Sequence, residues 1–156
     1  MKTRFQGMTL YISLFLFFIM TTQKAQAALG EPAESIAKDT KALSAAKRAT
    51  TTHISYTVQE IVSDANTVRE YITNTSIVFA IAWNGLSHPD LTLLLGSYSG
   101  DYQQALQKTQ HVPGRRHFQV KANNVVVEKW GHMRNLQGRA YIPTLIPQGF
   151  SVDEIR

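Results

Sequence analysis

The chain has 156 residues, enough for one domain, and 44% of them are hydrophobic. It contains no cysteine, which excludes disulfide bonds, thiolate zinc ligands and a cysteine nucleophile. The net charge of +5 includes Lys2, Arg4 and Lys24, and without these three it is +2, because all acidic residues lie downstream. So weak a positive charge argues against nucleic-acid binding, and we expect no nucleic-acid partner.

Residues 1–27 have the pattern of a secretory signal peptide. Lys2 and Arg4 are followed by an apolar stretch over residues 10–20, which is shorter than the roughly 20 residues of a membrane span. Ala25-Gln26-Ala27 has the small residues that signal peptidase accepts. We therefore expect cleavage before Ala28, no membrane span afterwards, and a periplasmic or secreted protein; the alternative is that the segment is retained as an anchor.

Residues 28–52 are polar and are expected to form either a linker or a surface helix over about residues 33–47. Only Ile36 and Leu43 are apolar on the face that such a helix would present. The sequence therefore predicts that the globular domain comprises residues 53–156.

From residue 53 the hydrophobic period changes to two, which predicts strands over residues 53–62 and 67–73. The apolar run Ile77–Trp83 follows, and an Asn-Gly turn signal ends it. We expect this run to be the central strand, buried on both faces. One predicted face carries the larger side chains, and the helix is expected to pack on the other, smaller face, formed by Val78, Ala80 and Ala82.

A helix is predicted over about residues 88–107, with Ser87 as its N-cap and Asp90 in its first turn. Its apolar stripe consists of Leu91, Leu94, Leu95 and Tyr98. The pair Asn123-Asn124 then predicts a hairpin, and further strand pattern extends to residue 142. The fold class is therefore α+β: a single antiparallel meander sheet of about six strands with one helix packed on it.

Several short motifs are similar to those of a group of exported bacterial proteins, the domain-of-unknown-function family 2844. The motifs are Tyr56-Thr57-Val58, Val68-Arg69-Glu70-Tyr71, Val78–Trp83, Pro89-Asp90-Leu91, Leu94–Tyr98, Gly131–Arg134 and Gly138–Pro143. The resemblance covers about residues 29–156. It implies a Gram-negative bacterial origin and export, and it implies no activity.

Four polar residues are candidates for a binding site: Glu70, His132, Arg134 and Arg139. Glu70 would share a strand face with Val68 and Ile72, so we expect it to be buried beside Arg139 or Arg134. These groups form either a structural ion pair or, together with His132, a polar patch that binds an anionic ligand.

The histidines lack the spacing of a metal site, and the chain has no phosphate-binding loop or dinucleotide fingerprint. We therefore expect no metal and no cofactor. The first hypothesis is a non-enzymatic binding or envelope-structural module with an envelope component or a protein as its partner. The alternative is a small hydrolase-like periplasmic enzyme that uses His132 with Glu70 or Asp90, and a third possibility is assembly through a sheet edge.

Overall fold

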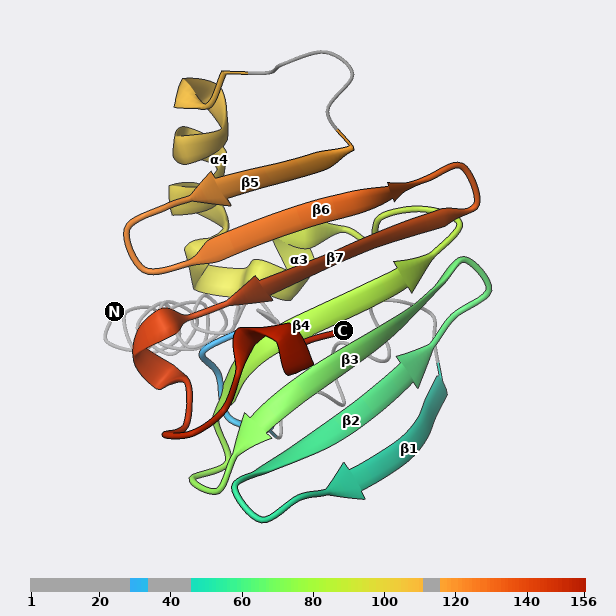
Figure 1. Ribbon diagram of the computed structural model, residues 1–156, viewed down its shortest axis with the longest axis vertical. Coiled ribbons are helices and arrows are strands. Elements are labelled where there is room, and N and C mark those ends of the chain that lie inside the picture. Colours follow the sequence, from blue (N-terminus) through green and yellow to red (C-terminus); the bar gives the residue numbers. More distant parts are fainter. Residues whose placement is uncertain (1–28, 34–45, 111–115) are drawn as a thin grey trace, which may run out of the picture.

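Seven antiparallel strands form one sheet in the computed structural model, which describes residues 29–33, 46–110 and 116–156 (Figure 1). The order of the strands is β1-β2-β3-β4-β7-β6-β5. Their bounds are β1 Ala46–Thr52, β2 Tyr56–Val62, β3 Asn66–Thr73, β4 Val78–Gly85, β5 His117–Lys121, β6 Val126–His132 and β7 Asn135–Tyr141. The predicted α+β class is confirmed, and β1 is the strand beyond the predicted six.

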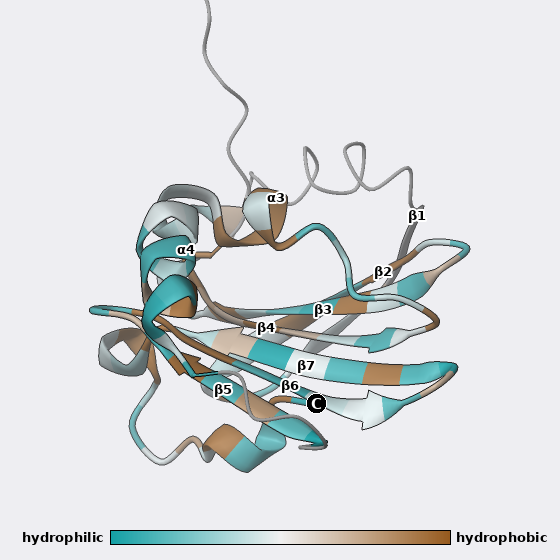
Figure 2. Ribbon diagram, turned by 90° about the horizontal axis from the view of Figure 1, so that it is seen from above, coloured by the Kyte–Doolittle hydropathy of each residue, from teal (hydrophilic) through white to brown (hydrophobic). Residues whose placement is uncertain are grey.

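The helices lie together on one side of the sheet (Figure 2). They are α3 (Leu91–Leu95) and α4 (Ser99–Lys108), joined by the 3-10 turn η2 (Gly96–Tyr98). Gly96 has a φ of +51°, which interrupts the α-helix where the sequence predicted a continuous one. No helix in the described ranges combines the length and the apolar character that a membrane span requires.

The first four strands are neighbours in chain order, but the last three are added in reverse. The helical segment carries the chain to the far edge, where β5 lies, and the chain then returns inward through β6 to β7. β7 pairs with β4, so β4 is the central strand, as predicted. Residues 78–83 of β4 are all buried.

The predicted assignment of the two faces of β4 is wrong. Ile81 and Trp83 pack in the same cluster as the leucines of α3, whereas Ala80 and Ala82 pack beside Ile155. The register between β3 and β4 skips Phe79, and this β-bulge interrupts the alternation of side chains. The helix therefore covers Ile81 and Trp83, whereas Phe79 lies with Ala80 and Ala82 against the C-terminal segment.

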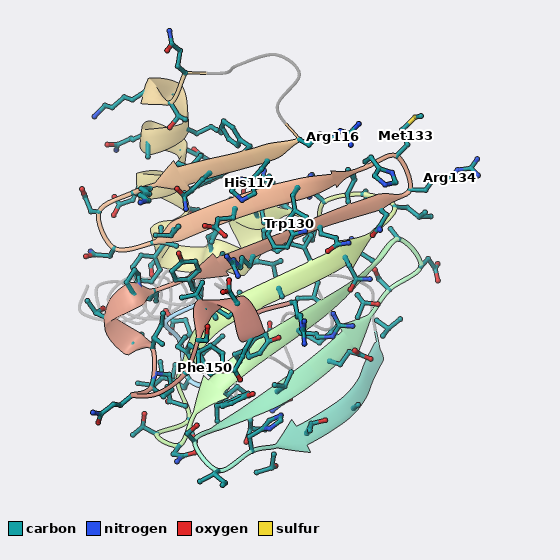
Figure 3. The ribbon with its side chains drawn as sticks, viewed as in Figure 1. Arg116, His117, Trp130, Met133, Arg134 and Phe150 are labelled. Atoms are coloured by element: carbon teal, nitrogen blue, oxygen red, sulfur yellow. The ribbon has the colours of Figure 1, made fainter. Side chains whose placement is uncertain are left out.

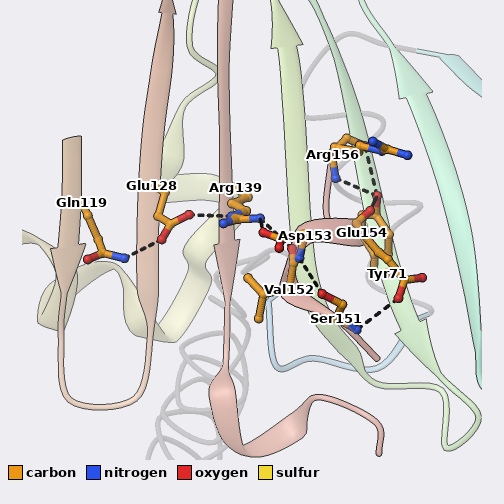
Figure 4. A network of polar contacts seen from close by, with 9 residues as sticks. All are labelled: Tyr71, Gln119, Glu128, Arg139, Ser151, Val152, Asp153, Glu154 and Arg156. Carbon is orange, nitrogen blue, oxygen red and sulfur yellow. Dashed lines mark hydrogen bonds and ion pairs between the residues drawn. The ribbon is translucent and has the colours of Figure 1, made fainter. Parts of the chain in front are cut away.

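The C-terminal segment covers part of the opposite face, which we call the open face because neither α3 nor α4 lies on it. This segment contains the 3-10 turns η3 (Pro143–Leu145) and η4 (Val152–Glu154). The ring of Phe150 lies 5.1 Å from that of Phe79 in an edge-to-face arrangement. The hydroxyl of Tyr71 accepts a hydrogen bond from the Arg156 backbone N–H at 3.1 Å (Figure 4).

The expected linker or surface helix over residues 28–52 is wrong at both of its ends. Leu29 is completely buried, and the next residue, Gly30, donates its backbone N–H to the Val78 carbonyl at 2.8 Å. At the other end, Ala46–Thr52 form the edge strand β1, which needs only backbone partners and tolerates polar side chains. The folded domain thus includes residues on both sides of 34–45; that range and the predicted signal peptide lie outside the described residues.

The N-cap of the helical segment is Asp90, not Ser87. The Asp90 carboxylate accepts a hydrogen bond from the Thr92 backbone N–H at 2.8 Å. We expect Asp90→Ala to lower the free energy of unfolding by about 1 kcal/mol, because this N–H loses its protein partner. Ser87→Ala is the matched control and should leave stability unchanged; urea unfolding monitored by circular dichroism measures both, and equal losses would contradict the assignment.

Candidate functional site

A hollow of about 480 Å³ lies on the open face, over β5, β6 and β7. We call it the open-face hollow. It is lined by Arg116, His117, Glu128, Trp130, Gly131, His132 and Arg139. Figure 3 shows His117 and Trp130 side by side on neighbouring strands, with Arg116 at the end of β5.

Strand alternation and cross-strand register bring these side chains to one face. Trp130 lies opposite His117 on one side and Gln137 on the other, and Glu128 lies opposite Arg139. The β6–β7 hairpin that closes this end depends on Gly131, which has a φ of +108°. A Cβ at this position would lie 2.1 Å from the Asn135 carbonyl oxygen, so only glycine fits.

The indole of Trp130 is held in place by its neighbours. Its Nε1–H donates to Oε1 of Gln137 at 3.0 Å, and the Gln137 amide in turn donates to Oδ1 of Asn135 at 2.9 Å. The guanidinium carbon of Arg139 lies 5.6 Å from the Trp130 ring centroid, within the range of a cation–π contact. The His117 ring is 6.2 Å away and nearly parallel, with an interplanar angle of 24°.

Glu128 is nearly buried, and neighbouring side chains donate hydrogen bonds to its carboxylate. One carboxylate oxygen accepts from Nε of Arg139 and the other from Nε2 of Gln119, both at 2.5 Å (Figure 4). Arg139 also donates through Nη1 to the Val152 carbonyl at 2.6 Å, which ties the site to the C-terminal segment. Burial, and then the charge of Glu128, raise the pKa of Tyr141, so this phenol stays protonated at neutral pH.

The structure brings two of the four predicted site residues together. His132 and Arg139 both line the open-face hollow. Arg134 occupies the left-handed position of the adjacent hairpin turn, with a φ of +66°, and its side chain extends away from the sheet (Figure 3). Glu70 is completely buried on the helix-covered face, between Val68 and Ile72 as expected.

The expected pairing of Glu70 with Arg139 does not form, because the two residues lie on opposite faces of the sheet. Glu70 is in register with Ile81, in the helix-side cluster, whereas Arg139 is in register with Ala82, in the other. The nearest carboxylate to Arg139 is that of Glu128, its direct cross-strand neighbour, and Oδ1 of Asp153 lies 3.7 Å from its Nη1.

Sequence reasoning missed four residues of this site: Arg116, His117, Glu128 and Trp130. A usable signal was present in β6, where Glu128, Trp130 and His132 alternate with Val127 and Lys129 and so share one face. Arg116 and His117 join the site only because β5 pairs with β6. No local sequence pattern reveals the register of that pairing.

In the described part of the chain His132 donates to no carboxylate, while Glu70 lies on the other face and Asp90 caps α3. No group of three metal-ligating side chains occurs among the described residues.

A family model described as "Protein of unknown function (DUF2844)" matches residues 25–155. No curated protein and no solved structure matches the chain.

Proposed function

Because the chain belongs to this family of unknown function, we propose a role from the chemistry of its surface: it is an exported bacterial binding module that holds an anionic ligand in the open-face hollow. The observation that carries the proposal is that Glu128, which lines the hollow, is already paired, whereas among the described residues Arg116 is not. Arg139 and Gln119 take up the carboxylate of Glu128, whereas Arg116 forms no ion pair with any described residue. The hollow therefore offers hydrogen-bond donors to a ligand, and the negative charge of Glu128 is already compensated by Arg139.

The side chains of the hollow define the kind of anion. Arg116, His117 and His132 are exposed and supply N–H donors around the half-buried indole of Trp130. An indole offers a flat apolar surface to a ring-shaped ligand, and a guanidinium binds carboxylate or phosphate oxygens in a bidentate manner. The preferred ligand is thus a ring compound that carries an acidic group.

Export is the second part of the proposal and rests on the sequence pattern of residues 1–27. It places the hollow in the periplasm or outside the cell. N-terminal sequencing of the protein from a periplasmic fraction tests it: a chain that begins at Ala28 supports export, and an intact N-terminus at Met1 in the cytoplasmic fraction contradicts it.

Tryptophan fluorescence provides a direct binding assay, because the chain has two tryptophans and only Trp130 lines the hollow. Benzoate and glucuronate serve as anionic ring probes, with benzyl alcohol and glucose as their neutral counterparts. We expect the two anions, and not the neutral compounds, to change the emission. We expect Arg116→Gln to weaken binding by about tenfold, the usual scale for losing one charge-assisted hydrogen bond.

Arg134→Gln is the matched control, since it removes the same charge from the neighbouring turn, where the side chain points away from the hollow. Trp130→Phe should abolish the signal while the buried Trp83 continues to report folding. Equal binding of the neutral compounds, or equal losses in the two arginine variants, would overturn the proposal.

A further inference from the structure

A second recess lies on the helix-covered side of the same strands, next to the end of α4. Its volume is about 420 Å³, within the roughly 300–1,000 Å³ of typical ligand sites. We call it the helix-side groove. The residues that matter for its chemistry are His88, Leu106, Arg116, Phe118, Lys129 and Leu136.

One wall of the groove is apolar. Leu106 at the end of α4 is 38% exposed, and Phe118 and Leu136 are half-buried on the sheet. These three side chains come from α4, β5 and β7, so the apolar surface is continuous across separate elements. An apolar ligand segment placed here removes this surface from water, which is favourable in proportion to the area covered.

His88 supplies a hydrogen-bond donor to the groove, opposite its apolar wall. Its Nδ1 accepts a hydrogen bond from Nε1–H of Trp83 at 2.8 Å. An indole N–H can only donate, so the neutral His88 ring carries its proton on Nε2. Burial, and then the charge of Lys129, lower the pKa of His88, which keeps the ring neutral at neutral pH. In the described part of the chain Nε2 has no partner, so it is available as a donor in the groove.

Two cations accompany this donor. The ammonium of Lys129 lies 5.6 Å from the centroid of the Tyr102 ring and forms no ion pair with a described residue. Arg116 lines this groove as well as the open-face hollow, and so do Trp130 and Gly131, where the two recesses adjoin. Asp90 belongs to the adjoining recess, which shares Leu106 and Lys129, but its carboxylate caps α3 instead.

We propose that the helix-side groove is a second binding site, specific for an amphiphile with a carboxylate head and a short alkyl tail. The head accepts hydrogen bonds from Lys129, Arg116 and His88 Nε2–H, and the tail lies along Leu106, Phe118 and Leu136. Head and tail are both required: a small anion leaves the apolar wall in water, and a neutral alcohol leaves the cations without a counter-charge. This site goes beyond the proposed function, because His88, Leu106 and Lys129 line the groove and not the open-face hollow, and because it takes a different class of ligand.

Isothermal titration calorimetry on the mature chain tests the proposal with three probes: octanoate, acetate and 1-octanol. We expect octanoate to bind with a stoichiometry of one, and acetate and 1-octanol to bind at least about tenfold more weakly. Lys129→Gln should weaken octanoate binding by about tenfold, the usual effect of removing one charged hydrogen-bond donor. Lys121→Gln is the matched control, because Lys121 is an exposed lysine of β5 that is not among the residues lining the groove.

Nuclear magnetic resonance supplies a readout that is specific to the site. The ¹⁵N resonance of His88 Nε2 should shift on addition of octanoate and stay unchanged with acetate at the same concentration. Leu106→Ser, at a position already in contact with water, should weaken octanoate binding and leave the response of Trp130 to benzoate unchanged.

The two sites can fail independently. Equal affinities for octanoate and 1-octanol, an unaltered affinity in Lys129→Gln, or an unchanged His88 resonance would each overturn the groove proposal. Loss of the benzoate response alone would overturn the open-face proposal and leave this one standing.

Discussion

Replacement of Trp83 by alanine is expected to lower the free energy of unfolding by about 3–5 kcal/mol, the usual range for a large aromatic residue in a core. Trp83 is only 2% exposed and lies on the central strand against the leucines of α3. Its ring fits directly over Gly138, where a Cβ would lie 2.2 Å from the indole. The substitution therefore leaves a cavity in the middle of the core and removes the hydrogen bond to His88.

Urea unfolding monitored by circular dichroism measures this loss without depending on tryptophan emission. Trp130→Ala is the matched control, because it deletes the same side chain from the half-exposed position in β6. It should cost clearly less than Trp83→Ala, since the indole of Trp130 already contacts water. Losses of equal size would contradict the central position of Trp83 in the core.

The second large effect is expected at Leu29, where replacement by alanine should cost about 2–5 kcal/mol. Leu29 is completely buried in the same cluster as Trp83, and its backbone N–H donates to the Leu94 carbonyl at 3.2 Å. It is also the second residue after the predicted cleavage site. Leu29 thus fills a place in the core between β4 and α3.

Chemical unfolding of the mature chain tests this expectation. Ile54→Ala removes an aliphatic side chain that is fully exposed in the turn before β2, so its stability should equal that of the unaltered protein. If Leu29→Ala were as stable as Ile54→Ala, the N-terminal residues would not belong to the core. A cleavage site beyond Leu29 would remove this contact, so the position of cleavage bears on stability.

The main elements of the fold were predictable because their signals are local. The run Ile77–Trp83 predicted the central strand, and the spacing of Leu91, Leu94 and Leu95 predicted a helix with one buried face. β1 was not predictable in this way, since its side chains are polar and its stability comes from backbone pairing with β2. The N-cap was misplaced by three residues, because both Ser87 and Asp90 are residue types that suit this position.

The candidate site was predicted in part. His132 and Arg139 were both predicted as members of a polar patch, and both line the open-face hollow. Trp130 was missed because its importance arises from its neighbours His117 and Gln137, which are remote in sequence or lie beyond a turn. Glu70 was correctly expected to be buried, but it does not pair with Arg139, because the two side chains lie on opposite faces of the sheet.

The sequence by itself determined the periodicity of the segments after residue 53, and therefore most of the strands, the helical segment and the buried stripe of its leucines. Only the tertiary structure decided which face each strand presents and which strands are neighbours. The bulge at Phe79 reverses the alternation along β4, and the return of β7 to β4 places Arg139 beside Glu128 instead of Glu70. The physical reason is that side-chain alternation depends on neighbouring residues along the chain, whereas register and strand order depend on contacts between residues far apart in sequence.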